Sequence, residues 1–221
     1  MAHPYWPLFD VEVHTPRLSL RYIDDELGVE LATLAAGGVH DPSFMPFALA
    51  WTDVEPPQLQ RNTLQYYWRT RAELEPEQWN LNFAVLADGT VIGSTGLSSR
   101  HFPTLRTFET GSWLGKAFQG RGFGKELRAA SLHLGFAGLG AEVAETAAYE
   151  DNAPSIGVTR SLGYSPNGSY RNKRRDDRAV VLRFTMAADH WQSIRRDDIE
   201  LTGVDEVLAM LGLTSGGDES G

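Results

Sequence analysis

The 221-residue sequence contains no cysteine, which excludes disulfide bonds, thiol nucleophiles and cysteine-ligated metal sites. Catalysis through an enzyme-bound thioester is excluded for the same reason. The six histidines show no metal-ligand spacing such as His-x-x-x-His with a nearby carboxylate. We therefore expect no metal site.

Long apolar runs and positive net charge are also missing. No stretch approaches the roughly 18 apolar residues of a membrane-spanning helix, and no cationic segment followed by an apolar one opens the chain. The formal net charge of −9 and the pI of about 5.1 disfavour nucleic acids and anionic membranes as partners, because these are themselves negative. The sequence predicts a cytoplasmic protein whose partners are cationic or amine-bearing molecules.

The domain organisation follows from length and composition. With 42% hydrophobic residues, a chain of this length can form one substantial core, and we expect a single domain over residues 1–196. Residues 197–221 differ in composition and are interpreted as a C-terminal extension. Within it, Val204–Leu211 is expected to form a short helix that packs on the domain or on a second subunit in a homodimer or higher oligomer. The Gly/Ser/Asp-rich end, Ser215–Gly221, is expected to be disordered.

Hydrophobic periodicity predicts a mixed α/β order of elements. Leu18, Leu20 and Tyr22 alternate with polar residues, as in a half-buried strand. Asp88-Gly89 is typical of a two-residue hairpin turn, because both residue types tolerate positive φ. The other expected strands are 83–87, 91–97, 108–114, 143–149 and 180–186, and the expected helices include 25–36, 56–74 and 123–137. A charged run, Arg171–Arg178, is interpreted as a solvated turn.

The predicted helix over residues 123–137 has one apolar stripe. In it, Leu127, Ala130, Leu134 and Ala137 repeat at intervals of three and four residues. We expect this stripe to face the sheet, and the glycines at 138 and 140 to end the helix.

A glycine-rich turn lies between the predicted strand 108–114 and this helix. Such a turn presents several backbone N–H groups, reinforced by the helix dipole, to one anion, and therefore predicts phosphate binding. The phosphate loop of nucleotide hydrolases does not fit, because Gln119 stands where its first glycine belongs and Glu126 where Ser or Thr should follow. The dinucleotide fingerprint fails at Lys125. A nucleotide-dependent kinase or dehydrogenase is disfavoured accordingly.

The remaining pattern, Gln-x-x-Gly-x-Gly from Gln119 to Gly124, resembles the pyrophosphate loop of the GCN5-related N-acyltransferase (GNAT) superfamily, whose members bind acyl-coenzyme A. The flanking segments Glu109–Leu114, Asn152–Ser155 and Arg160–Tyr164 occur in the order of that family. Thr15–Arg21 is similar to the first strand of its branch that acetylates ribosomal-protein N-termini. The resemblance covers roughly residues 14 to 188.

This resemblance implies a fold with a mixed, mostly antiparallel sheet of about seven strands, splayed between the fourth and fifth strands and flanked by helices. It also implies an acyl-coenzyme A-dependent N-acyltransferase, with acetyl-CoA as the default donor and a small molecule, a protein or peptide N-terminus, or a lysine supplying the amine. More narrowly, Trp6–Asp10, Val39–Pro42, Met45–Phe47 and Ser112–Gly115 are similar to a mycobacterial member described as a succinyltransferase, which makes succinyl-CoA the alternative donor.

The resemblance assigns coenzyme-binding roles to the glycine turn and the strand before it. Backbone amides would hold the pyrophosphate, and the residues concerned are Gln119, Gly120, Arg121, Gly122, Phe123, Gly124 and Lys125. The side chains of Arg121 and Lys125 either add charge to this site or are merely solvent-exposed. A backbone donor near Trp113 or Leu114 would polarise the thioester carbonyl.

Three polar side chains are the catalytic candidates. Glu109 is either a general base that deprotonates the incoming ammonium through a water or a glutamate paired with a neighbouring strand. Asn152 resembles an asparagine that hydrogen-bonds the coenzyme arm. Ser155 is placed to protonate the departing thiolate, because Thr159 or Arg160 stands where many members have a tyrosine. Alternatively, Ser155 is only a helix N-terminal residue after Pro154.

Acceptor recognition is assigned to the aromatic-rich segment between the first two predicted strands. Phe47 and Trp51 are candidate pocket residues, and His40 and Arg61 are candidates to meet an acyl carboxylate if succinyl-CoA is the donor. A non-catalytic acyl-CoA-binding module that acts through a protein partner remains the alternative to an enzyme. The candidate acid and base residues disfavour it, because a pure binder needs neither.

Overall fold

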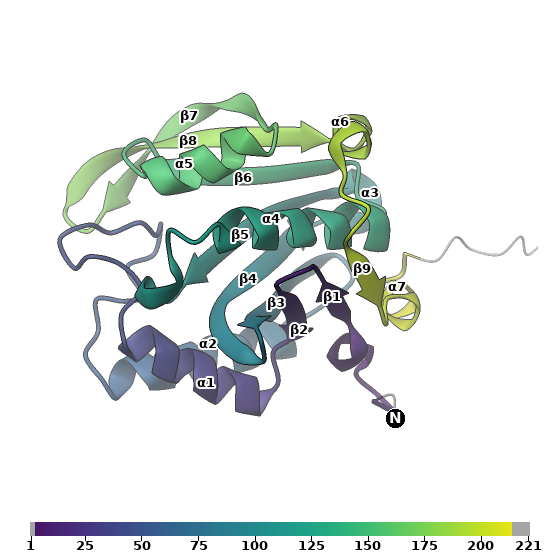
Figure 1. Cartoon of the computed structure of the whole chain (residues 1–221), viewed down its shortest axis with the longest axis horizontal. Helices are drawn as coiled ribbons and strands as arrows, with labels where there is room; N and C mark the ends of the chain where they lie inside the picture. Colours follow the sequence, from purple (N-terminus) through teal and green to yellow (C-terminus); the bar gives the residue numbers. More distant parts are fainter. Residues whose placement is uncertain (1–2, 214–221) are drawn as a thin grey trace, which may run out of the picture.

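The computed structural model, which describes residues 3–213, is built around one nine-stranded sheet with the order β7-β8-β6-β5-β4-β3-β2-β1-β9 (Figure 1). The strands are β1 (Glu12–His14), β2 (Ser19–Tyr22), β3 (Gln78–Ala87), β4 (Thr90–Arg100), β5 (Thr107–Leu114), β6 (Val143–Tyr149), β7 (Ser165–Arg174), β8 (Asp177–Ala187) and β9 (Glu200–Thr202). The β5–β6 pair is parallel and the other pairs are antiparallel. The predicted mixed, mostly antiparallel fold is confirmed.

Helices cover both faces of the sheet. They are α1 (Asp25–Ala36), α2 (Gln58–Ala72), α3 (Phe102–Leu105), α4 (Phe123–His133), α5 (Ala153–Ser161), α6 (Ala188–Ile194) and α7 (Asp205–Met210), with short turns η1 (Pro7–Asp10), η2 (Lys116–Phe118) and η3 (Leu134–Gly138). Successive side chains of β5 point to opposite faces of the sheet, so their contacts show which helices cover each face. Phe108 packs on Phe136 behind α4, whereas Trp113 packs with the α1 residues Leu27 and Leu31 on the opposite face.

The sheet has two more strands than the seven expected, because β1 and β9 pair with each other at one edge. Both strands are three residues long, too short for the alternation that marks a strand in sequence. The chain after β9 returns to the core: Val207 and Leu211 are fully buried in the main hydrophobic cluster. The predicted helix 204–211 is confirmed as α7, and the expected disorder of Ser215–Gly221 falls outside the described residues.

The predicted apolar stripe of the helix after the glycine turn is wrong at its end. Ala137 is exposed and Phe136 is buried instead, because the helix widens into the π-helical turn η3 at Leu134. The widening shifts the inward face by one position. Gly135 permits it, since a Cβ at this position would lie 2.2 Å from the ring of Phe108.

Candidate active site

The site is organised by the divergence of β5 from β6. The two strands pair only from Thr107–Glu109 to Val143–Glu145, although β5 continues to Leu114 and β6 to Tyr149. The register therefore leaves the facing edges of residues 110–114 and 146–149 without strand pairing. Unpaired backbone groups need another hydrogen-bonding partner, so this divergence can accept an extended ligand with amide groups.

The glycine turn lies at the open end of the β5–β6 divergence. Gly120 and Gly122 have φ of +73° and +81°, a region that L-residues with a side chain rarely adopt. Gly122 is the N-cap of α4 and supplies no capping side chain, so the first N–H groups of α4 are left available. An anion at this helix N-terminus would receive those hydrogen bonds and the favourable end of the dipole.

The side chain of Gln119 does not face a ligand but fixes the turn. Its amide donates to the carbonyl oxygens of Val39, at 2.6 Å, and Leu114, at 2.8 Å. Gln119 thereby ties the glycine turn both to the end of β5 and to the loop that follows α1. The sequence pattern identified the residue, but its structural task depends on a contact across 80 positions.

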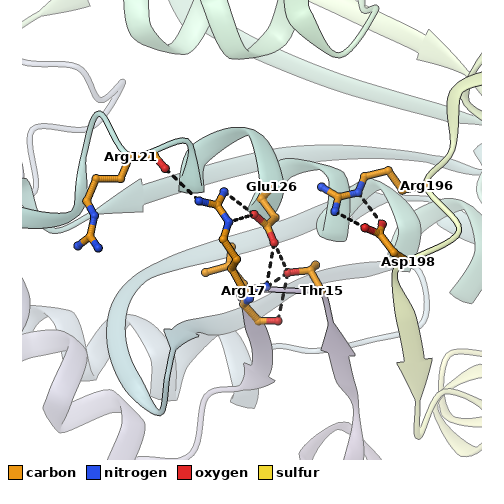
Figure 2. A network of polar contacts seen from close by, with 7 residues as sticks. Thr15, Arg17, Arg121, Glu126, Arg196 and Asp198 are labelled. Atoms are coloured by element: carbon orange, nitrogen blue, oxygen red, sulfur yellow. Dashed lines mark hydrogen bonds and ion pairs between the residues drawn. The ribbon is translucent and has the colours of Figure 1, made fainter.

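A second anchor of the turn comes from the N-terminal segment and is shown in Figure 2. Glu126 is buried, and its carboxylate accepts hydrogen bonds from the Thr15 hydroxyl (2.7 Å), the Arg17 backbone N–H (3.1 Å) and the Arg17 Nε (2.6 Å). The Arg17 Nη1 also donates to the Arg121 carbonyl oxygen at 3.2 Å. Burial alone would raise the pKa of Glu126, but these hydrogen bonds and the charge of Arg17 lower it on balance.

Cations flank the same turn. The guanidinium groups of Arg17 and Arg121 lie 4.9 and 5.0 Å from the ring centroid of Phe123, and Lys125 is exposed in the first turn of α4. The sequence singled out Arg121 and Lys125 but missed Arg17. Arg17 lies in the bend between β1 and β2, far from the glycine turn in sequence, and nothing near it in the sequence indicates a ligand site.

Glu109 lies at the closed end of the β5–β6 divergence and lines a pocket of about 380 Å³. Partial burial raises its pKa, and the neighbouring Glu145 raises it further, against the opposing charge of Arg183. Glu145 has partners of its own, because Asn167 donates to it at 3.1 Å and Arg183 at 3.4 Å. Glu109 has no hydrogen-bond or ion-pair partner among residues 3–213, so its carboxylate is available to a ligand or a water.

A larger pocket, of about 710 Å³, adjoins it on the face of the sheet that carries α2. Asn80 and Ser98 line both pockets. The larger pocket has an apolar and aromatic wall with scattered amides, and its lining includes Phe47, Leu49, Trp51, Val54, Tyr66, Tyr67, Arg69, Asn82 and Trp113. Its size and composition suit a small organic molecule or the end of a peptide.

The four predicted substrate-pocket residues are placed differently. Phe47 and Trp51 line the larger pocket, with Trp51 packed against Trp113 at 5.7 Å between ring centroids. His40 is held inside its own loop, where its ring nitrogens contact the Thr52 hydroxyl at 2.6 Å and the Asp41 carbonyl oxygen at 2.8 Å. Arg61 is exposed on α2 and is not among the lining residues.

The charged run at the tip of the β7–β8 hairpin is more than a solvated turn. Arg174 forms a bidentate ion pair with Asp151, with both contacts at 2.7 Å. Arg175 reaches the loop between α1 and α2, where it binds Asp53 through contacts of 2.6 and 2.7 Å and the Pro42 carbonyl oxygen at 2.9 Å. These contacts tie the tip of the β7–β8 hairpin to the loop between α1 and α2, which lines the larger pocket.

Comparison with known proteins places the chain in a family. Residues 17–165 match the acetyltransferase (GNAT) domain family. The chain belongs to this family. Solved structures of similar fold include RimL, described as a ribosomal L7/L12 alpha-N-protein acetyltransferase in complex with coenzyme A, at 16% identity and a TM-score of 0.67 over 80% of this chain and 97% of that one. A GCN5-related N-acetyltransferase from Brucella melitensis matches at 20% identity and a TM-score of 0.65, over 83% and 81% of the two chains.

In this GNAT chain, α5 begins beside the β5–β6 divergence with Asn152 as its N-cap. The Asn152 side chain accepts a hydrogen bond from the Ser155 backbone N–H at 3.3 Å, so it satisfies the helix terminus. The Ser155 hydroxyl has no partner among residues 3–213. Both residues are partly accessible.

The described part of the GNAT chain offers neither a cluster of metal ligands nor a membrane-spanning helix. Among residues 3–213, no group of three or more His, Asp or Glu side chains is arranged to hold a metal ion. In the same part of the chain, no helix combines the length and apolar character needed to cross a bilayer.

Proposed function

We propose that this GNAT protein transfers an acyl group from coenzyme A to a primary amine by direct attack of the amine while both substrates are bound. Acetyl-CoA is the default donor for the family, and succinyl-CoA is the variant suggested by the narrower sequence resemblance. The observation that carries the proposal is Glu109, a carboxylate with a raised pKa and no side-chain partner among residues 3–213, at the closed end of the β5–β6 divergence. A protein that only bound acyl-CoA would need no such group.

Each step of the proposed reaction has a residue of suitable chemistry. The coenzyme supplies an activated acyl thioester, and the free N–H groups at the start of α4 suit its pyrophosphate. Glu109 takes a proton from the ammonium through a water, because an alkylammonium is almost wholly protonated at pH 7. Glu109 passes this first proton to solvent. As the new N–C bond forms and the C–S bond breaks, the Ser155 hydroxyl gives its proton to the departing sulfur and regains one from solvent water. The remaining amine proton then leaves through the ionised Glu109 to solvent, so that the amide, the free thiol and one released proton are the products.

The test compares coenzyme binding with turnover in Glu109→Gln. We expect the affinity for acyl-CoA, measured by calorimetry, to stay within about twofold, while kcat/KM falls by about 10²- to 10⁴-fold, the usual contribution of a general base. Glu142→Gln, which changes an exposed glutamate just before β6, is the matched control and should leave both quantities unchanged. Unchanged turnover in Glu109→Gln would remove the base from the proposal.

The proposed role of Glu109 fixes the direction in which kcat/KM changes with pH. Glu109 must be ionised to accept a proton, so kcat/KM should rise with pH through a pKa above the ordinary carboxyl value of 4.5. Glu145→Gln removes the neighbouring negative charge and should move this rise to lower pH. If no amine in a broad panel turns over while acyl-CoA still binds, the protein is a binding module rather than an enzyme.

A further inference from the structure

Arg128 in α4 is a buried cation without a counter-charge. The residue is 5% exposed, and among residues 3–213 it forms no ion pair. Its Nη1 donates to the Thr146 hydroxyl at 3.0 Å, whereas its Nε is buried with no hydrogen-bond partner. Buried charges are costly unless they are paired, so a buried guanidinium without an ion pair is a candidate partner for an anionic group of a ligand.

The position of Arg128 indicates which ligand group reaches it. The Thr146 hydroxyl that receives its hydrogen bond donates in turn to the Thr110 carbonyl oxygen at 3.1 Å. Thr110 and Thr146 are the first residues beyond the last paired positions of β5 and β6. The guanidinium therefore lies at the closed end of the divergence, on the side covered by α4.

The length of the divergence fits a coenzyme arm that ends near this guanidinium. The glycine turn follows β5 at Leu114, and the four residues back to Thr110 span about 13 Å of extended strand. With its pyrophosphate at the start of α4, an arm lying along β5 would bring its acyl end toward Thr110. This step rests on the function proposed above.

We propose that Arg128 binds a carboxylate at the far end of the acyl group, so that the preferred donor is the coenzyme A monothioester of a dicarboxylic acid such as succinate. Arg128 would then supply the charge recognition for which the sequence offered only His40 and Arg61. His40 is committed to Thr52 and Asp41. Neither Arg61 nor Arg128 lines the two pockets described here, but Arg61 is exposed on α2, whereas Arg128 is bonded to Thr146 at the β5–β6 divergence.

Wild-type protein alone can test this recognition. Calorimetry would compare succinyl-CoA with butyryl-CoA, which has the same chain length but a methyl group in place of the carboxylate, and with acetyl-CoA and free coenzyme A. A charge-assisted hydrogen bond in a buried site predicts that succinyl-CoA binds about tenfold to a hundredfold more tightly than butyryl-CoA. Equal binding of the two, or tighter binding of butyryl-CoA, would overturn the proposal without any variant.

Variants then assign the effect to the residue. Arg128→Met keeps the length of the side chain without its charge, and should abolish the succinyl preference while leaving acetyl-CoA affinity within about threefold. Arg128→Lys should restore part of the preference. The control is Arg178→Met, an exposed arginine of β8 with no ion pair among residues 3–213, which should leave the preference intact.

Three other outcomes would overturn either the role of Arg128 or the proposed function. Loss of preference in Arg61→Met with Arg128→Met unchanged would move the carboxylate to the α2 side and overturn the assignment. Equal weakening of acetyl-CoA and succinyl-CoA by Arg128→Met would mean that Arg128 contacts the thioester or the arm instead. Failure of every coenzyme A derivative to bind the wild-type protein would count against the proposed function itself, which separates the two hypotheses.

Discussion

Removal of the Arg17–Glu126 contact offers a quantitative test of how the glycine turn is held. The two partners differ in environment: the side chain of Arg17 is 49% exposed and that of Glu126 is 5% exposed (Figure 2). Without Glu126, the arginine can turn toward water. Without Arg17, the carboxylate stays buried and keeps only the Thr15 hydroxyl and the backbone N–H of residue 17.

This asymmetry sets the expected magnitudes. Breaking a fully buried ion pair costs about 3–5 kcal/mol, and the exposure of Arg17 reduces that for Glu126→Gln to about 2 kcal/mol. Arg17→Met leaves the buried Glu126 carboxylate without its ion-pair partner and should lower the free energy of unfolding by about 3 kcal/mol. The double variant should cost less than the sum of the two by about 1–2 kcal/mol, because the partners are in direct contact.

Urea unfolding and coenzyme A calorimetry measure the two consequences. Arg17→Met should also weaken coenzyme A binding, because it removes the hydrogen bond to the Arg121 carbonyl oxygen within the turn. The exposed pair Arg196–Asp198, with two contacts of 2.7 Å, is the control: Asp198→Asn should cost less than about 1 kcal/mol and leave binding unchanged.

The pH dependence provides an independent check. The folded-state pKa of Glu126 is lowered, so its stabilisation is present above the ordinary value of 4.5 and is lost as the pH falls through the folded pKa. The difference in unfolding free energy between wild type and Glu126→Gln should shrink over that range. Additive single variants, or an Arg17→Met cost no larger than that of Asp198→Asn, would refute the reasoning.

Three further changes test other parts of the site. Gly122→Ala places a side chain at φ +81°, which should cost about 1–2 kcal/mol and weaken coenzyme A binding as measured by calorimetry. Gly135→Ala would put a Cβ 2.2 Å from the Phe108 ring, so thermal unfolding should show a loss of about 1–3 kcal/mol. Asp53→Asn breaks the ion pair with Arg175 at an exposed site, so we expect under about 1 kcal/mol of destabilisation but a higher KM for the amine at unchanged coenzyme affinity.

The features predicted correctly from sequence are those with local signals. Asp88-Gly89 forms the predicted tight turn between β3 and β4, with φ of +47° and +75° at the two positions. The strand, glycine turn and helix around Gly122 were also predicted from consecutive residues. In each case the conformational demand is met within a few positions of the chain.

The features that sequence did not predict depend on distant pairing. The sequence singled out Glu126 only because it breaks the phosphate-loop pattern of nucleotide hydrolases. Its contact with Arg17, 109 positions away, shows that it anchors the glycine turn. Ala137 was misplaced because a π-helical turn leaves no periodicity of its own. Arg128 has the position of an ordinary helix residue in sequence, and only its burial beside Thr146 indicates a role.

The choice of α4 rather than α5 as the anion site follows from how the two helices begin. Because β5 and β6 are parallel, the connections that follow them leave the sheet at the same edge, and both helix N-termini lie near the open end of the divergence. At α5, the Asn152 side chain already accepts a hydrogen bond from the Ser155 N–H, one of the first N–H groups of the helix. At α4, Gly122 has no side chain to do so and has a positive φ of +81°. The helix that lacks its own cap is therefore the one whose N-terminus we propose as the site of the coenzyme pyrophosphate.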